Sequence, residues 1–255
     1  MDAGLKACWD EDWAKAQSVV KMGSAKLDEI DSDGWCMMHH AVWGGRKDLL
    51  EALLAAGASP RVKDKEGLTP GTLACAKERW ELAQCVASQG RKLDEQDVDG
   101  WAMLHYAAAH GQESLTSMLL ARGADASLSD RERLTPALAA CAKDEWKTAL
   151  LLSNHGASLG AQDEDGWSLA HYAVDKGQKE LLSSLIQRGA PLDKLNADGM
   201  SPGALALSDP NNHWAVAELI DAGVQVDSKS LAQADLGVNG RTAEEPARAP
   251  RHFRG

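Results

Sequence analysis

Residues 97–129 read DVDGWAMLHYAAAHGQESLTSMLLARGADASLS, and the order of polar and apolar residues in this segment indicates the fold. A turn-rich start is followed by an apolar segment, a glycine, a second apolar run and another glycine. In the second run Leu115, Met118 and Leu119 stand at positions i, i+3 and i+4, which form one face of a helix. The stretch therefore predicts a turn followed by two short helices.

The same unit recurs with a period of 33 residues. An acidic residue or its amide opens each unit, at Asp31, Asp64, Asp97, Asp130, Asp163 and Asn196. Three positions later, five of the six units carry a glycine, where a tight turn needs one, and the fourth unit has Arg133. A fixed period of this length is the signature of stacked repeats, whose short helices are stable only when they pack against neighbouring units.

The units alternate between two kinds, so the better repeat is 66 residues long. Odd units read Asp-Gly-Trp and then His-x-Ala, at 33–41, 99–107 and 165–173. Even units read Leu-Thr-Pro or Met-Ser-Pro and then Leu-Ala, at 68–74, 134–139 and 200–206. A hydroxyl followed by proline predicts a helix start, because the hydroxyl caps the helix and proline fixes φ near its helical value.

These motifs resemble the ankyrin repeat, whose unit has the same length. Its Thr-Pro start is found in the even units, its His-x-Ala start in the odd units, and its Leu-Leu-x-x-Gly-Ala ending at 53–58, 119–124 and 185–190. The resemblance implies an all-α solenoid of stacked helix-turn-helix units joined by β-turns. It further implies that His39, His105 and His171 hydrogen-bond backbone groups in the adjoining turns.

The domain organisation follows from the period. We expect six repeats, at 31–63, 64–96, 97–129, 130–162, 163–195 and 196–228. Residues 1–30 resemble an even unit without its opening turn and are read as a diverged helical N-terminal cap. Pro210 should separate the two helices of the last repeat. Residues 229–255 show no apolar periodicity and are predicted to be a disordered tail.

One departure from the repeat pattern concerns the turn between the two helices of a unit. Even units carry Glu78 and Asp144 where the odd units have Gly45, Gly111 and Gly177. We therefore expect this turn to differ between the two kinds of unit.

Charge and composition limit the partners. The chain has a formal net charge of −11, while residues from Ser228 onward carry five Lys or Arg against three Asp or Glu, so the negative charge lies in the repeats. An acidic body repels phosphate backbones, and nucleic-acid binding is not expected. The sequence shows neither a bilayer-spanning apolar run nor a signal-peptide pattern, so we expect no membrane association and a cytoplasmic, or alternatively nuclear, protein. The five cysteines are read as buried thiols in a reducing compartment.

The sequence lacks several signatures of catalysis and metal binding. The chain contains no Cys-x-x-Cys pair, no His-Glu-x-x-His zinc pattern and no Gly-rich phosphate loop. The motif histidine recurs in every odd unit, whereas one active site does not need three copies of a residue spread along a repeat protein. We therefore predict a non-enzymatic protein without catalytic residues, cofactor or metal.

Two further series of residues are candidates for partner binding. The residue before the turn glycine position is always acidic: Asp33, Glu66, Asp99, Glu132, Asp165 and Asp198. The residue after it is always large and apolar: Trp35, Leu68, Trp101, Leu134, Trp167 and Met200. The resemblance places both positions on the projecting turn beside the concave face, where partners bind. It also places Trp43, level with Ala109 and Asp175, on the concave surface.

Alternatives remain at each of these positions. Turn chemistry explains Asp before Gly but does not favour Glu66 or Glu132. The turn tryptophans could instead pack over the neighbouring turn and stabilise the stack. Four other tryptophans begin second helices and are expected to be packing residues: Trp13, Trp80, Trp146 and Trp214. Trp9 lies in the diverged cap, where the sequence assigns it no face.

The sequence thus predicts a protein-interaction module or adaptor that binds a basic and apolar protein or peptide segment through an acidic, Trp-bearing turn and concave surface. Two alternatives are a regulatory or inhibitory subunit of a partner enzyme and an effector directed at a host. The sequence leaves the oligomeric state open.

Overall fold

The computed structural model describes residues 1–89 and 92–224, and within these ranges the regular structure is entirely helical, as predicted. The predicted disordered tail at 229–255 lies outside the described residues. The first helices of the cap and the repeats are α1 (Ala3–Trp9), α3 (Met37–Trp43), α5 (Pro70–Ala76), α7 (Met103–Ala109), α9 (Pro136–Ala142), α11 (Leu169–Asp175) and α13 (Pro202–Ser208). The second helices are α2 (Trp13–Lys21), α4 (Lys47–Ala55), α6 (Trp80–Gln89), α8 (Glu113–Ala121), α10 (Trp146–Asn154), α12 (Lys179–Gln187) and α14 (Trp214–Asp221).

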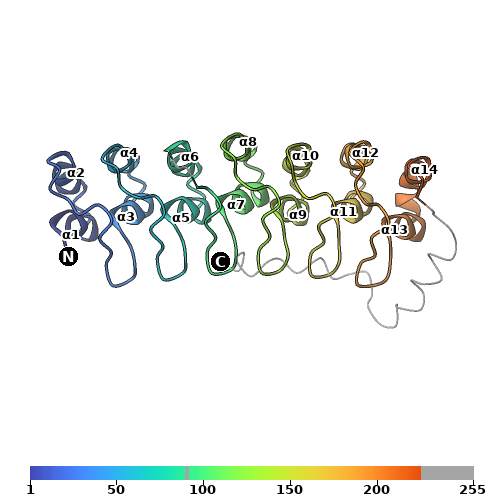
Figure 1. Cartoon of the computed structure of the whole chain (residues 1–255), viewed down its shortest axis with the longest axis horizontal. Coiled ribbons are helices and arrows are strands. Elements are labelled where there is room, and N and C mark those ends of the chain that lie inside the picture. The colour runs from blue at the N-terminus through green and yellow to red at the C-terminus, as the bar shows by residue number, and fades with distance from the viewer. Residues whose placement is uncertain (90–91, 225–255) are drawn as a thin grey trace. The chain divides into compact units, whose positions relative to one another are not determined.

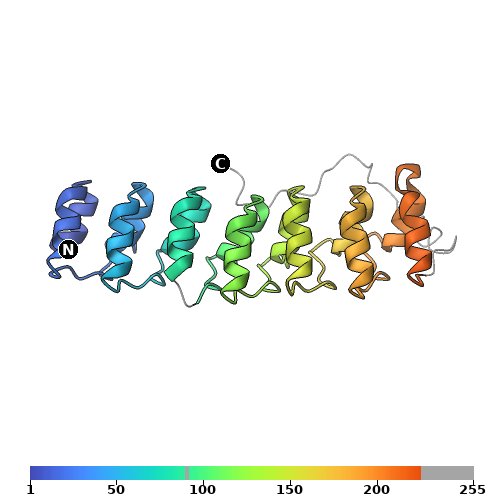
Figure 2. The same cartoon turned by 90° about the horizontal axis from the view of Figure 1, so that it is seen from above.

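The described residues form two compact units, one of Met1–Ala107 with Gln112–Asp125 and one of Ala108–Gly111 with residues 126–224. In the first unit, α2, α4, α6 and α8 lie side by side in one row, the first helices form a second row, and the turns project beyond them (Figure 1). The row of second helices in this unit is seen from above in Figure 2. In the second unit, α10, α12 and α14 form one row and α9, α11 and α13 the other.

The first helices are only seven residues long and are buried on almost every side. All residues of α3 from Met37 to Val42 and all residues of α11 from Leu169 to Val174 are buried. The second helices bury one stripe each, such as Leu181, Leu182 and Leu185 in α12. Burying a leucine contributes about 1.5–3 kcal/mol, so neighbouring repeats supply the stability that such short helices lack alone.

The opening Asp or Asn of each repeat builds the projecting turn. Asp64 Oδ1 accepts hydrogen bonds from the backbone N–H groups of Glu66 (2.9 Å) and Leu68 (2.8 Å). The turn glycine adopts a left-handed conformation, with φ 83° at Gly34. A Cβ on Gly34 would come within 3.0 Å of the Asp64 Cα in the next turn, so the glycine also permits successive turns to pack closely.

The helix starts predicted for the even units are confirmed. Proline occupies the first turn of α5, α9 and α13. Thr69 Oγ1 accepts from the Thr72 N–H at 3.2 Å, and Ser201 Oγ accepts from the Ala204 N–H at 3.1 Å. Pro210 does separate the last two helices, because a short 3₁₀ segment, η1 (Pro210–Asn212), lies between α13 and α14.

The prediction that the inter-helix turn differs in even units is wrong at the level of the backbone. Glu78 and Asp144 adopt φ values of 54° and 60°, close to the 68° and 66° of Gly45 and Gly177. The same left-handed turn is therefore present in the cap and in the first five repeats, whereas η1 takes its place in the sixth. Non-glycine residues pay a steric cost for this conformation because of their Cβ.

Candidate protein-interaction surface

The acidic residue before the turn glycine position is exposed in five repeats, at Asp33, Glu66, Asp99, Asp165 and Asp198, and half-buried at Glu132. The turn uses the backbone of this residue. The Asp33 N–H donates to Asp31 Oδ1 (2.9 Å), and its carbonyl accepts from the Lys65 N–H of the next turn (3.3 Å). Turn geometry thus accounts for the opening aspartate. It does not require a carboxylate at the third position of the turn, the one directly before the glycine position.

The large apolar residues after the glycine position divide into two groups. Leu68, Trp101 and Leu134 are buried, and Trp101 has no exposed surface at all. Trp35, Trp167 and Met200 are half-buried. For the buried group, the structure favours the packing alternative over contact with a partner.

The turn tryptophans pack on an aromatic residue that follows the motif histidine. The Trp101 and Tyr106 ring centroids are 4.9 Å apart, and those of Trp167 and Tyr172 are 5.2 Å apart. The Tyr172 hydroxyl donates to Asp163 Oδ2 at 2.8 Å. Burial raises the pKa of Tyr172, which keeps its hydroxyl protonated as a donor.

The first repeat carries His40 in place of this tyrosine. Its Nε2 lies 2.8 Å from Asp31 Oδ2. Burial alone would raise the pKa of Asp31, but hydrogen bonds from the Trp35 and Asp33 amides and from His40 lower it. The sequence held a signal for this network, since His40, Tyr106 and Tyr172 stand 66 residues apart, yet sequence reasoning missed it.

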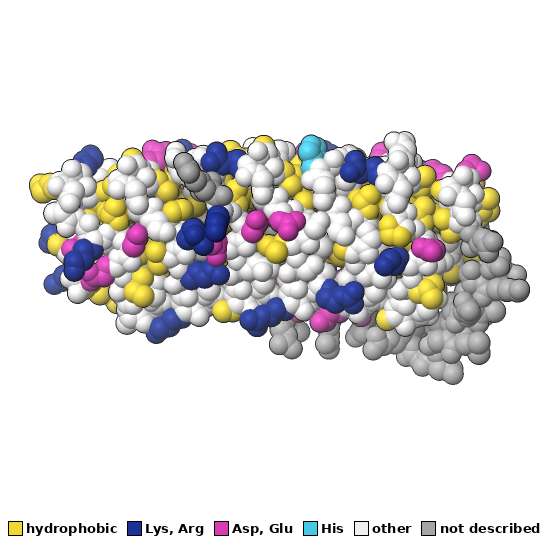
Figure 3. Space-filling view, in the orientation of Figure 1, with side chains coloured by type: hydrophobic (Ala, Val, Ile, Leu, Met, Phe, Trp, Pro, Cys, Tyr) yellow, Lys and Arg dark blue, Asp and Glu magenta, His cyan; other side chains and the backbone are white. Residues whose placement is uncertain are grey.

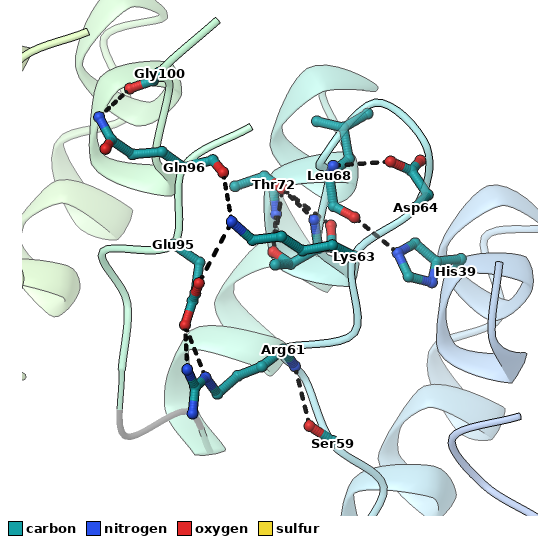
Figure 4. Close-up of polar contacts among 11 residues, drawn as sticks. His39, Ser59, Arg61, Lys63, Asp64, Leu68, Thr72, Glu95, Gln96 and Gly100 are labelled. Carbon is teal, nitrogen blue, oxygen red and sulfur yellow. Dashed lines mark hydrogen bonds and ion pairs between the residues drawn. The ribbon is translucent and has the colours of Figure 1, made fainter. Parts of the chain in front are cut away.

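The motif histidines have the structural role that the resemblance implied. His39 Nδ1 accepts from the Cys36 N–H (3.2 Å), and its Nε2 donates to the Leu68 carbonyl of the next turn (3.0 Å; Figure 4). His171 Nε2 donates in the same way to the Met200 carbonyl at 3.0 Å. Burial lowers the pKa of both His39 and His171, so the neutral ring that this pattern needs is favoured.

Exposed aromatic rings gather at the ends of α1 and α3. Trp9 and Trp43 are the last residues of these helices, and each is 49% exposed. The ring centroids connect in series: Trp9 lies 5.9 Å from His40, His40 lies 5.2 Å from Trp35, and Trp35 lies 5.5 Å from Trp43. We call these four residues the N-terminal aromatic patch. Trp43 is exposed, its place on a concave binding surface stays a prediction, and Trp9 ends α1 as Trp43 ends α3.

A cation of the chain itself already uses one ring of this patch. The Lys77 Nζ lies 4.9 Å from the centroid of the Trp43 ring. The Arg79 guanidinium donates from Nη2 to the Trp43 carbonyl oxygen at 2.9 Å, which fixes the end of α3 through its backbone. The Trp43 ring is therefore placed to accept positive charge.

Several basic residues of the first unit are engaged by neighbouring loops. Arg61 Nε donates to Glu95 Oε1 (2.8 Å), and Lys63 Nζ donates to the Gln96 carbonyl (2.8 Å; Figure 4). On the face of this unit drawn in Figure 3, basic, acidic and apolar side chains are interspersed. The contacts of Arg61 and Lys63 connect successive loops, so both cations are engaged within the chain.

The described residues give little support to thiol chemistry, metal binding or a membrane-spanning helix. The thiols are buried at Cys8, Cys36, Cys75 and Cys141, and burial raises the pKa of Cys8 to about 12 and of Cys36 to about 11. Within residues 1–89 and 92–224, no three metal-ligating side chains gather. No helix in those ranges is long and apolar enough to cross a bilayer.

One short segment of the chain matches a motif of serine hydrolases. Residues 156–160 read Gly-Ala-Ser-Leu-Gly, a match to the Gly-x-Ser-x-Gly pattern. Ser158 lies in the loop after α10, whereas a nucleophile elbow requires a strand-to-helix turn.

The hollow lined by Pro60, Thr69 and Met103 holds about 10 Å³, the space of roughly one water.

Comparison with known proteins gives a consistent family. The model of ankyrin repeats in three copies matches residues 38–130 and 132–230. The mouse B-cell lymphoma 3 protein homolog is 29% identical over 75% of this chain, and the chain spans 44% of that relative's length. The "Probable 26S proteasome regulatory subunit p28" of Saccharomyces cerevisiae is 23% identical, with 80% of this chain and 92% of the yeast protein aligned.

Solved structures agree with this assignment. The crystal structure of the ankyrin repeat domain of Bcl-3 superimposes with a TM-score of 0.67 at 25% identity, covering 80% of this chain and 92% of that domain. An ankyrin repeat domain from Acinetobacter baumannii superimposes with a TM-score of 0.65 at 21% identity, covering 74% of this chain and 98% of the other. The second likeness concerns the fold alone.

Proposed function

Because the chain belongs to the ankyrin repeat family, whose repeats are protein-interaction modules, we propose that its acidic turns bind a partner segment that is basic and apolar in alternation. The observation that carries the proposal is the exposed acid at the third position of the turn. The opening aspartate is used by the turn itself, whereas the carboxylates of Glu66, Asp165 and Asp198 are exposed and are not needed for turn geometry.

The charge of the chain supports the same conclusion. A net charge of −11 would steer a basic segment toward the repeats and raise the association rate, an effect that salt weakens. Trp35, Trp167 and Met200 supply partly exposed apolar surface next to three of the acids. The proposed role is that of a non-enzymatic adaptor.

The test compares two variants that lose the same number of charges. In the turn variant, the exposed acids become their amides: Asp33→Asn, Glu66→Gln, Asp165→Asn and Asp198→Asn. The control variant neutralises four exposed acids on second helices: Glu51→Gln, Glu113→Gln, Glu180→Gln and Asp221→Asn. Proteins captured from a lysate by each variant are compared by mass spectrometry, after circular dichroism has shown that both are folded.

We expect the turn variant to lose partners that the control variant keeps. Equal loss from both variants would mean that only net charge matters, and full retention by the turn variant would reject the turns as a binding surface. Side-chain neutralisation should leave the fold intact, because exposed ion pairs such as Lys65–Asp33 (3.6 Å) contribute at most about 1 kcal/mol.

A second candidate is a regulatory subunit of a partner enzyme, favoured by the likeness to the "Probable 26S proteasome regulatory subunit p28" of yeast, which covers 92% of that protein. A stoichiometric partner whose catalytic activity changes on addition of the purified chain would support this role. A partner whose activity is unaffected would favour the adaptor.

A further inference from the structure

The N-terminal aromatic patch is not repeated along the chain. The residue type at the end of the first helix differs between repeats, and Trp is found there only in the cap and the first repeat. Both tryptophans end a first helix, and the equivalent residues that end α5 and α11 are Ala76 and Asp175. The exposed aromatic rings at this position are thus confined to the cap and the first repeat. Packing between repeats does not explain them, since each leaves about half of its surface in solvent.

The chemistry around these rings selects for a cation. Lys77 Nζ lies over the Trp43 ring at 4.9 Å, an arrangement in which the negative face of the ring attracts positive charge. Carboxylates flank the patch in the sequence: exposed Asp10 follows Trp9 directly, and exposed Asp33 precedes Trp35 by two residues. Rings and carboxylates together match a guanidinium, which stacks on aromatic faces and donates several hydrogen bonds in one plane.

We propose that the N-terminal aromatic patch is a docking site for an arginine side chain of the partner segment. The guanidinium stacks on the exposed ring of Trp9 and replaces the Lys77 ammonium over Trp43. Asp10 accepts its hydrogen bonds, and Asp33 exchanges its exposed pairing with Lys65 for the guanidinium. Arginine is preferred over lysine because its planar group is more weakly hydrated and loses less on leaving water. This inference deepens the proposed function and rests on it, since it names the residue that anchors the basic segment at one end of the repeats.

The experiment uses two synthetic peptides as probes and the full chain as receptor. One peptide alternates arginine and leucine; in the other every arginine is replaced by citrulline, which keeps the planar shape and removes the charge. Binding is measured by isothermal titration calorimetry. We expect the citrulline peptide to bind about tenfold more weakly or worse.

Receptor variants separate ring stacking from simple apolar contact. Trp9→Leu with Trp43→Leu keeps apolar side chains but removes the aromatic faces, and should weaken the arginine peptide about tenfold. The backbone bond from Arg79 to the Trp43 carbonyl survives this change, so the end of α3 keeps its anchor. Asp175→Ala, at the equivalent position of the fifth repeat, is the matched control and should leave the affinity unchanged.

Several results would overturn the inference. A folded leucine variant that binds the arginine peptide as tightly as the native chain would remove the rings from the site. Equal binding of the citrulline peptide would show that charge plays no part, and no binding of either peptide to the native chain would exclude an arginine site. If the leucine variant binds normally while the turn variant described above loses its partners, the turn surface stands and only the aromatic site fails.

Discussion

At the residue scale, the non-glycine residues that adopt positive φ within 1–89 and 92–224 are the most direct test of how the repeats enforce their turns. Asp144, at φ 60°, occupies the position that glycine holds in the odd repeats. Asp144→Gly should raise the free energy of unfolding by about 1 kcal/mol, because relief of left-handed strain exceeds the entropy that glycine adds to the unfolded chain. Urea denaturation followed by circular dichroism measures the change.

The reciprocal substitution provides the control for this prediction. Gly177, at φ 66°, has no heavy atom within 4 Å of an added Cβ, so Gly177→Asp introduces backbone strain without a clash. It should lower stability by a similar amount, about 1 kcal/mol. If Asp144→Gly instead lowered stability, strain at this turn could not be the dominant effect.

The buried tyrosines of the odd repeats give a second prediction at this scale. Tyr172→Phe keeps the ring that packs on Trp167 but removes the donor to Asp163, whose side chain is buried. Leaving a buried carboxylate without this donor should cost about 1–3 kcal/mol. Thermal and urea unfolding of Tyr172→Phe test this, and stability within about 0.5 kcal/mol of the native chain would contradict it.

The sequence predicted some residues of the site better than others. The opening aspartates and turn glycines could be read directly, because only a few residue types satisfy the hydrogen bonds and positive φ of such a turn. The orientation of Trp101 could not, because it depends on Tyr106, five positions later, and on packing that a local motif does not encode. Trp9 was missed for a related reason: the cap lacks the turn motif that sets the alignment, although Trp9 and Trp43 occupy equivalent helix ends.

At the element scale, the motif histidines join one repeat to the next and make stability dependent on pH. His39 and His171 each bridge the start of their own helix and a carbonyl of the following turn. Burial lowers the pKa of both below the usual 6.5. A group with a lowered folded-state pKa contributes stability that is present above the unfolded pKa and is lost as the pH falls.

We therefore expect the free energy of unfolding to decrease as the pH is lowered from about 7 to about 5. Asp163 acts in the opposite direction, because burial raises its pKa and its protonation favours the folded state as the pH falls. Urea unfolding across this range, repeated with a His39→Asn, His171→Asn variant, isolates the histidines. The variant should be less stable at neutral pH but show a flatter dependence, and an unchanged slope would exclude these rings as the cause.

Secondary structure was predictable at this scale wherever a helix carries its own start signal. Thr69-Pro70 and Thr135-Pro136 identified the beginnings of α5 and α9. The turn between helices was mispredicted at Glu78 and Asp144, because residue preference argued for a different turn while the packing of paired helices demanded the same one. Tertiary packing overrides local preference in such cases, at an energetic cost.

At the scale of the whole molecule, periodicity made the fold readable, while the binding surface had to be argued from exposure and charge. The same pattern of residues recurs in several repeats, so a single exception such as Arg133 at the turn glycine position does not prevent its recognition. Binding residues vary independently of that rule, and the N-terminal aromatic patch is a departure from the repeat that only packing and exposure reveal.

Stacking by nearest neighbours also predicts where each unit opens first. In the first unit, α1 packs against α2 and α3, whereas α3 packs against α1, α4 and α5. In the second unit, α14 packs against two α-helices, α12 and α13, and the three-residue η1, whereas α11 packs against three α-helices, α9, α12 and α13. Helices with fewer packed neighbours lose less on opening, so amides of α1 and α14 should exchange with solvent faster than those of α3 and α11.

Hydrogen exchange followed by mass spectrometry measures this gradient, with rates in the urea-unfolded chain as the reference for intrinsic exchange. We expect protection to increase from α1 to α3 in the first unit and from α14 to α11 in the second. Equal protection in all four helices would mean that each unit unfolds as a single cooperative block, and it would contradict the nearest-neighbour account of its stability.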